Sequence, residues 1–170
     1  MLKGNDLYMK RRDKINYYLD MADVALERGT CMRRNFGAII VNNDEIVSTG
    51  YAGAPRGRSN CSDINTCVRD KLNIPRGERY EMCRSVHAET NAIISAKRCD
   101  MLGGTLYLAG RDAKTGELIP DSAPCAMCKR IIINAGIKLV IIRNTMNDYT
   151  SINVSNWIDN DESLNGTSGY

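Results

Sequence analysis

The chain has 170 residues, of which 43% are hydrophobic and 25% are charged, and its formal net charge is +3. These values are typical of a globular protein with one domain of ordinary size. No apolar run approaches the roughly 20 residues that span a bilayer, and the charge falls short of a dedicated polynucleotide-binding surface. We therefore expect a single domain over residues 1–160, no membrane association, and a disordered polar tail over residues 161–170.

The first half of the chain predicts a helix followed by a hairpin. Apolar residues recur at helical spacing over residues 13–28, and Gly29 follows as a C-terminal stop signal. Two β-branched runs over residues 36–41 and 45–50 are separated by a polar turn, which is the pattern of a β-hairpin. Residues 51–86 show no clear periodicity, so they predict a long loop that is functional or pinned.

In the second half of the chain, predicted helices and strands alternate. We expect a helix over residues 87–98, a strand over 105–109, a helix over 125–135, a strand over 138–142 and a last helix over 152–158. A helix, a hairpin and then alternating helix and strand predict an α/β sandwich with a mixed sheet.

The cysteine content and the start of the chain bear on where the protein resides. The chain contains seven cysteines, an odd number and too few for a disulfide scaffold of this length. Residues 1–6 lack the apolar stretch of a secretory signal. We expect reduced thiols, some of them bound to metal, in a cytoplasmic protein.

The only histidine of the chain, His87, is followed two residues later by Glu89 and then by the run Pro124-Cys125-Ala126-Met127-Cys128. One imidazole and two thiolates can hold a zinc ion and leave its fourth position open for water. Zinc lowers the pKa of bound water so that a nucleophile forms near neutral pH, and a free carboxylate beside it can move the protons. The chain therefore carries the H-x-E…P-C-x-x-C signature of the zinc-dependent nucleobase deaminases.

Both parts of this pattern fall at predicted helix starts. Unpaired backbone N–H groups and the positive end of a helix favour a thiolate over a thiol there. Alone, a histidine is more often structural than catalytic, and a C-x-x-C pair can be a metal site, a redox site or chance. Their joint occurrence in this order favours zinc bound by His87, Cys125 and Cys128, with Glu89 as the proton shuttle.

A second group of cysteines precedes this motif. Four thiolates suit a closed, structural tetrahedral zinc site, which would hold a loop that has no core of its own. The spacing matches no standard zinc ribbon, and the alternative is that these cysteines are small buried hydrophobic residues. The group consists of Cys31, Cys61, Cys67 and Cys83.

Beyond the zinc signature, residues 31–142 resemble the deoxycytidylate (dCMP) deaminase branch of the cytidine deaminase superfamily. The resemblance is carried by residues 31–34, 36–41, 50–57, 72–84 leading into 87–89, and 133–137. It implies a five-stranded sheet flanked by helices, as a three-layer α/β/α sandwich, and a catalytic zinc on the three ligands named above. It also implies homo-oligomers, from dimer to hexamer, and a second zinc in some members. The backbone around Ala88 and Ala123 would read the edge of the pyrimidine.

Two features depart from the pattern of that family. Ala52 stands where the family commonly has an asparagine, a side chain that can both donate and accept hydrogen bonds. The loop over residues 110–122 is longer than in typical members. Both departures bear on which substrate fits.

A nucleotide phosphate would need donors near the mouth of the site. Arginine suits this role because its fork binds two oxygens at once, although most arginines simply decorate a solvated surface. The arginines in the segments expected near the mouth are Arg33, Arg34, Arg56 and Arg58.

We therefore expect a zinc-dependent hydrolytic deaminase that converts a cytosine nucleotide, dCMP, to dUMP with release of ammonia. One alternative is the same chemistry on another nucleobase, nucleoside or modified nucleotide. A base within a polynucleotide is disfavoured, because aromatic residues make up 6% of the chain and the net charge is low. The other alternative is a non-catalytic zinc-bound regulatory module, against which Glu89 argues because a structural site needs no free carboxylate.

Overall fold

The computed structural model describes residues 10–75 and 77–160, and the predicted tail over residues 161–170 lies outside them. The elements in chain order are α1 (Lys14–Leu26), β1 (Arg34–Asn42), β2 (Glu45–Tyr51), α2 (Val68–Lys71), η1 (Tyr80–Met82), α3 (Ala88–Ile94), α4 (Arg98–Met101), β3 (Thr105–Asp112), α5 (Ala126–Ala135), β4 (Leu139–Arg143), β5 (Tyr149–Asn153) and α6 (Ser155–Asp159).

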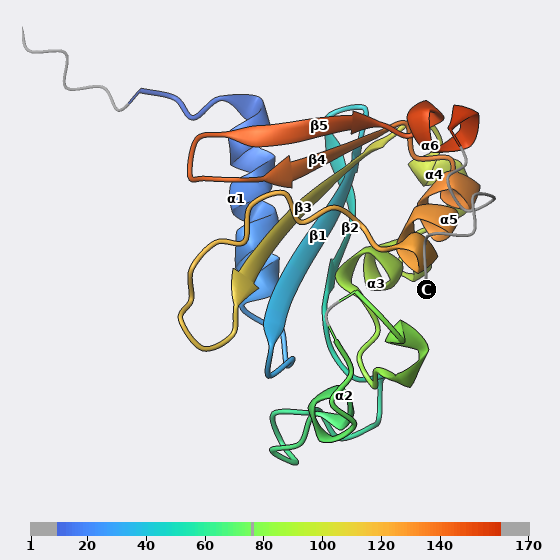
Figure 1. Cartoon of the computed structure of the whole chain (residues 1–170). Helices are drawn as coiled ribbons and strands as arrows, with labels where there is room; N and C mark the ends of the chain where they lie inside the picture. Colours follow the sequence, from blue (N-terminus) through green and yellow to red (C-terminus); the bar gives the residue numbers. More distant parts are fainter. Residues whose placement is uncertain (1–9, 76, 161–170) are drawn as a thin grey trace, which may run out of the picture.

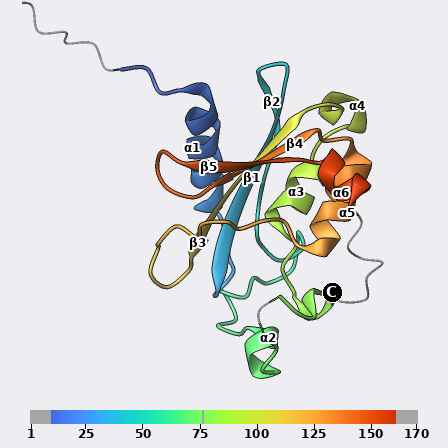
Figure 2. The same ribbon diagram turned by 45° about the horizontal axis from the view of Figure 1, so that its top comes forward.

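A mixed five-stranded sheet lies between two helical layers, as the sequence predicted (Figure 1). The strand order is β2-β1-β3-β4-β5, in which β3 and β4 are parallel and the other neighbours are antiparallel. Helix α1 covers one face of the sheet, whereas α3 and α5 cover the other (Figures 1 and 2). No helix in the described part of the chain is long and apolar enough to cross a membrane.

The core consists of two apolar layers, because successive residues of a strand point to opposite faces of the sheet. In β1, Ile39 and Val41 pack with α1, whereas Ala38 and Ile40 pack with residues of α3 and α5. Strands β1, β3 and β4 each contain a continuous buried run, as expected of central strands that are covered on both faces.

The start of α3 is fixed by a close approach to β2. A Cβ atom on Gly50 would collide with the carbonyl oxygen of Ala88 and the amide nitrogen of Ala92, so only glycine allows this contact. The Ser48 hydroxyl donates to the Ala92 carbonyl oxygen at 2.8 Å. Because His87 is the N-cap of α3, these contacts also determine where the imidazole lies.

Several predicted elements are confirmed. Strands β1 and β2 form the predicted antiparallel hairpin, and its turn residues Asn43 and Asp44 have φ of 49° and 69°. The helices predicted over residues 13–28 and 125–135 correspond to α1 and α5, and the strands predicted over 105–109 and 138–142 correspond to β3 and β4.

Two predicted helices differ from the structure. The helix predicted over residues 87–98 ends at Ile94, because the Ser95 hydroxyl bonds back to the Asn91 carbonyl oxygen and a separate α4 follows. The helix predicted over residues 152–158 is wrong in its first part, where β5 pairs with β4 and only then gives way to α6.

Candidate active site

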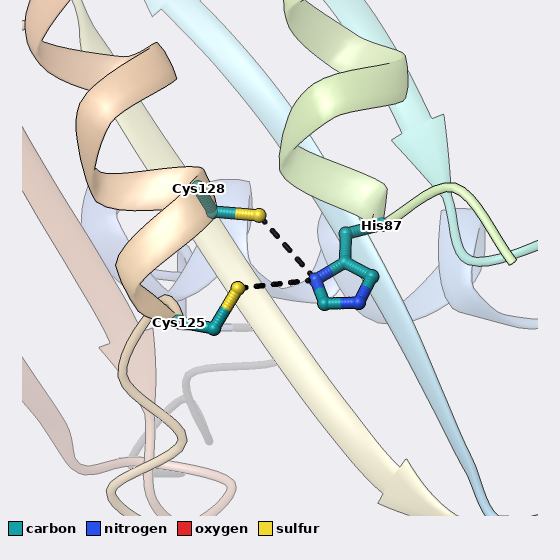
Figure 3. Close-up of side chains that lie close together, drawn as sticks. All are labelled: His87, Cys125 and Cys128. Atoms are coloured by element: carbon teal, nitrogen blue, oxygen red, sulfur yellow. Dashed lines mark hydrogen bonds between the residues drawn. The ribbon is translucent and has the colours of Figure 1, made fainter. Parts of the chain in front are cut away.

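Three side chains from two helix starts converge beside the sheet (Figure 3). His87 Nδ1 lies 3.5 Å from Cys125 Sγ and 3.4 Å from Cys128 Sγ. His87 is the N-cap of α3 and Cys125 is the N-cap of α5, while Cys128 lies in the first turn of α5. The packing of α3 against α5 therefore brings together residues that are 38 and 41 positions apart in the chain.

This arrangement fits a tetrahedral metal ion. Zn–S bonds of ~2.3 Å and Zn–N bonds of ~2.0–2.1 Å place nitrogen and sulfur about 3.5 Å apart at tetrahedral angles. The two measured N···S distances match that value, and all three ligand atoms lie within 4.8 Å of one another. Three protein ligands leave a fourth position for water, as in catalytic zinc sites.

A hydrogen bond couples the two thiols of this group. The pKa of Cys125 is lowered to about 4, chiefly because it accepts a hydrogen bond from Cys128 and also because of the bond from His87. The pKa of Cys128 is raised because it donates that bond and because it is buried. Burial alone would lower the pKa of His87, but the bond to Cys125 and the nearby negative charges raise it overall. A divalent cation bound here would replace the shared proton, since metal ligands are deprotonated.

Glu89 lies in the first turn of α3, next to this group and buried, with only 5% of its surface exposed. Burial raises the pKa of its carboxyl, and the charge of His87 opposes that rise. Glu89 is not a member of the group whose ligand atoms lie within 4.8 Å of one another. Its carboxylate is thus adjacent to the metal ligands without being one of them.

A pocket of about 260 Å³ opens beside these residues. Its wall contains His87, Glu89 and Cys125, together with both residues predicted to read the pyrimidine edge, Ala88 and Ala123. Ala52 also lines it, so the departure from the family pattern places a methyl group in the wall.

Two of the four arginines predicted to contact a phosphate line this pocket. Arg33 and Arg34 lie in its wall. Arg56 and Arg58 are exposed and lie outside the wall. Sequence reasoning missed two other arginines of the wall, Arg69 and Arg84, because no local pattern distinguishes them from surface residues.

The long loop after β3 forms a small hairpin of its own. Arg111 pairs with Leu118, and the Asp112 amide donates to the Glu117 carbonyl oxygen at 2.9 Å. Only its last residues, Asp121 and Ser122, reach the pocket wall. The rest of the loop projects from the end of β3 and does not line the pocket (Figure 1).

The four upstream cysteines gather at one end of the same pocket. All of them line it, and burial together with the other three thiols raises the pKa of Cys61. The Arg33 amide also donates to Cys31 Sγ at 3.5 Å. Among the described residues, however, the only group of ligand atoms within 4.8 Å of one another is that of His87, Cys125 and Cys128. A second zinc on Cys31, Cys61, Cys67 and Cys83 stays a prediction.

Residues 12–144 match the family described as the cytidine and deoxycytidylate deaminase zinc-binding region. The chain belongs to this family. Its membership and the three-ligand group together identify zinc as the cofactor, with His87, Cys125 and Cys128 as the residues that fit it.

Other members of this deaminase family are similar over most of the chain. The deoxycytidylate deaminase of Mycobacterium phage D29 is 36% identical over 138 residues, which are 78% of this chain and 96% of the phage protein. That of Schizosaccharomyces pombe is 32% identical over 132 residues, which are 78% of this chain but 37% of the yeast protein. The crystal structure of the dCMP deaminase from cyanophage S-TIM5 is 25% identical, with a TM-score of 0.53 over 79% of this chain and 86% of that one.

Proposed function

We propose that this protein is a deoxycytidylate deaminase, which hydrolyses dCMP to dUMP and releases ammonia. One observation carries the proposal: the buried carboxyl of Glu89 lies beside a three-ligand metal group without belonging to it. The relatives from phage D29 and S-TIM5, both named as deaminases of dCMP, support a cytosine nucleotide as the substrate. The reaction consumes one water, because a C4–O bond forms as the C4–N bond breaks.

In this mechanism Glu89 carries the protons. Zinc, when bound by His87, Cys125 and Cys128, lowers the pKa of a water in its fourth position. Glu89 accepts the proton that the water gives up and delivers it to N3 of the pyrimidine. A later transfer takes a proton to the departing amino group, and each step leaves the carboxyl ready for the next. Burial raises the pKa of Glu89, which helps its carboxyl to hold the proton between the two transfers.

The backbone on both sides of the pocket is suited to hold the pyrimidine. Ala88 is the first residue of α3, so its N–H has no partner within the helix and can donate to the ring. The Ala123 N–H already donates to the Asp121 carbonyl oxygen at 2.8 Å. Ala123 therefore offers its carbonyl oxygen, which can accept from the amino group that is removed.

Of the predicted phosphate contacts, we retain Arg33 and Arg34. Both line the pocket, and Nη1 of Arg33 is buried without a hydrogen-bond partner among the described residues. Arg56 and Arg58 are exposed outside the wall, and Arg56 donates to the Ser95 hydroxyl at 3.4 Å. We assign these two no contact with the substrate.

A substrate panel tests the proposed function. Ammonia release is measured from dCMP, cytidine, cytosine, guanine and adenosine with the zinc-loaded protein and with protein depleted by a chelator. We expect dCMP to be turned over fastest and the depleted protein to be inactive until zinc is restored. Turnover of a purine with every cytosine nucleotide inert would overturn the choice of substrate.

We also propose a second, structural zinc on the four cysteines at the other end of the pocket. The proposal is supported by their convergence around the buried Cys61. Metal analysis of the purified protein should give about two zinc ions per chain, and about one in a Cys67→Ser variant. One zinc ion in both proteins would contradict a second site.

The remaining proposals concern location and assembly. All seven cysteines are free, which supports the reducing cytoplasm as the location. Exposed apolar side chains along the outer face of α1 support a homo-oligomer, from dimer to hexamer; they are Tyr17, Met21 and Val24. Light scattering of the purified protein would give the mass, and a monomer at all concentrations would exclude this assembly.

A further inference from the structure

Arg69 is buried next to the reaction centre although neither its spacing nor its charge pattern singles it out. It lies on α2, beyond the end of the sheet at which β1 begins (Figures 1 and 2). Arg69 is 6% exposed, and it lines the same pocket as His87 and Glu89. Burying a guanidinium is costly unless its charge and its N–H groups find partners.

The loop holds the Arg69 guanidinium in a fixed orientation. Its Nη2 donates to the carbonyl oxygens of Pro75 at 2.6 Å and Glu78 at 2.8 Å. Its central carbon lies 4.6 Å from the centre of the Tyr80 ring, and that ring meets His87 edge-on at 5.2 Å. The guanidinium is therefore one aromatic ring away from a metal ligand, with its plane set before any substrate enters.

The charge of Arg69 is only weakly balanced, because it acts on the exposed Glu81 as the smallest of the causes that lower the pKa of that carboxyl. Among the described residues, Arg69 forms no ion pair with a carboxylate, and neither does Arg84 in the same wall. Within the described part of the chain, Nε of Arg69, Nε of Arg84 and Nη1 of Arg33 are buried without a hydrogen-bond partner. Arg33 does pair with Asp70, at 3.4 Å, but through its Nε. Three guanidinium groups thus keep donors for an anion at one end of the pocket.

We propose that Arg69 and Arg84, together with Arg33, bind the phosphate of the nucleotide, and that Arg69 makes the site specific for a nucleoside monophosphate over a nucleoside. This inference rests on the proposed deamination of dCMP and names the residues that select its phosphate. A phosphate supplies the missing negative charge, and its oxygens match the forked donors of arginine. The ring of the same substrate then reaches the metal ligands from the side of Tyr80.

The decisive variant is Arg69→Gln, which removes the charge and keeps an amide donor. Steady-state kinetics with dCMP and deoxycytidine are combined with calorimetric binding of the product dUMP. We expect kcat/KM for dCMP and the affinity for dUMP to fall about 10- to 100-fold, because charge-assisted hydrogen bonds are lost. The change should lie mainly in KM, and kcat/KM for deoxycytidine should change by less than about 3-fold.

The matched control is Lys71→Gln. Lys71 lies two residues further along α2, is exposed, and lies outside the pocket wall. Its substitution therefore removes the same charge without changing the site. We expect it to bind dUMP as the unmodified protein does. Zinc content and melting temperature are measured for every variant. Should Arg69→Gln fold poorly, Arg69→Lys and Arg84→Gln decide the matter, with an expected loss of about 10-fold in dUMP affinity each.

Three results would overturn the inference. One is unchanged dUMP binding by the folded Arg69 and Arg84 variants. Another is an equal loss of kcat/KM for dCMP and deoxycytidine, which would mean that Arg69 does not read the phosphate. The third is a loss of zinc with Arg69→Gln, which would show that Arg69 supports the proposed zinc site on the four upstream cysteines and does not bind phosphate. A protein that turns over no cytosine nucleotide at all would instead refute the proposed function itself.

Discussion

The two walls of the pocket are built by different means. One wall, which we call the metal wall, consists of His87, Glu89 and Cys125 at the starts of α3 and α5, together with the buried Cys128, which does not itself line the pocket. The other, the loop wall, is formed by the pocket-lining residues within the range 61–85, and the regular structure of the described part of this loop is α2 and η1 alone. Under the proposed function, helix packing places the groups that react, whereas contacts within the loop place the groups that recognise the substrate. Changes in the metal wall should therefore alter kcat, and changes in the loop wall should alter KM.

The largest effect is expected from Glu89→Gln in the metal wall. The amide cannot carry a proton, so kcat should fall about 10²- to 10⁴-fold while zinc stays bound. Ammonia release at fixed times gives kcat, and metal analysis of the same sample gives the zinc content. The exposed Glu45 on β2 gives the control Glu45→Gln, which should be fully active. Retained turnover in Glu89→Gln would show that Glu89 does not carry the protons, whereas a protein that releases no ammonia with or without Glu89 would be the non-catalytic zinc module.

A large effect is also expected from Gly50→Ala, which tests whether packing places the metal wall. The new Cβ would collide with backbone atoms of Ala88 and Ala92, so α3 must shift. Overpacking of this kind costs about 1–3 kcal/mol of stability. A displacement near 1 Å can lower the rate by about 10²-fold. The neighbouring exposed residue gives the control Thr49→Ala, and equal kcat in the two variants would show that α3 does not depend on this contact.

A smaller effect is expected from Tyr80→Leu in the loop wall. The ring supports the Arg69 guanidinium, and cation–π contacts of this kind contribute about 0.5–1 kcal/mol. We expect KM for dCMP to rise about 3- to 5-fold with kcat nearly unchanged. Initial rates over a range of dCMP concentrations separate the two constants. A fall in kcat alone would show instead that Tyr80 acts through His87.

The smallest effect concerns the stability of the metal wall. The folded-state pKa of Glu89 is raised, so the stability it contributes is present below its unfolded pKa and is lost as pH rises through the folded pKa. In protein depleted of zinc, Glu89→Gln should therefore raise the melting temperature near pH 7 and leave it unchanged near about pH 4. An equal change in melting temperature at both pH values would mean that burial does not destabilise the ionised carboxyl of Glu89.

The metal wall could be predicted from the sequence because its residues carry a local signal. His87 and Glu89 at one helix start, and the Cys125 and Cys128 pair at another, follow from spacing alone, and the structure brings the three ligands together. The central strands and α1 were predictable for the same reason, since periodicity is local. Strand β5 was missed because its partner β4, and not its own apolar pattern, determines its conformation.

The loop wall was much less predictable. The orientation of the Arg69 guanidinium is determined by carbonyl groups up to nine residues away and by the Tyr80 ring. None of these contacts leaves a pattern in the sequence. Conversely, Arg56 lies in a segment that resembles the family and Arg58 follows directly after it, yet both side chains are exposed outside the pocket wall. Proximity along the chain was a poor guide to proximity in space wherever no helix or strand connected the two.

The separation of the metal ligands along the chain has a consequence for biosynthesis. His87 is made 38 residues before Cys125 and 41 before Cys128, so the ligand set is incomplete until the start of α5 has been made. A growing polypeptide in which α5 has not yet been made cannot bind the ion through all three ligands. The complete ligand set forms only when α3 and α5 have docked, so a protein that holds the ion on all three ligands is also one in which these two helices have packed against each other.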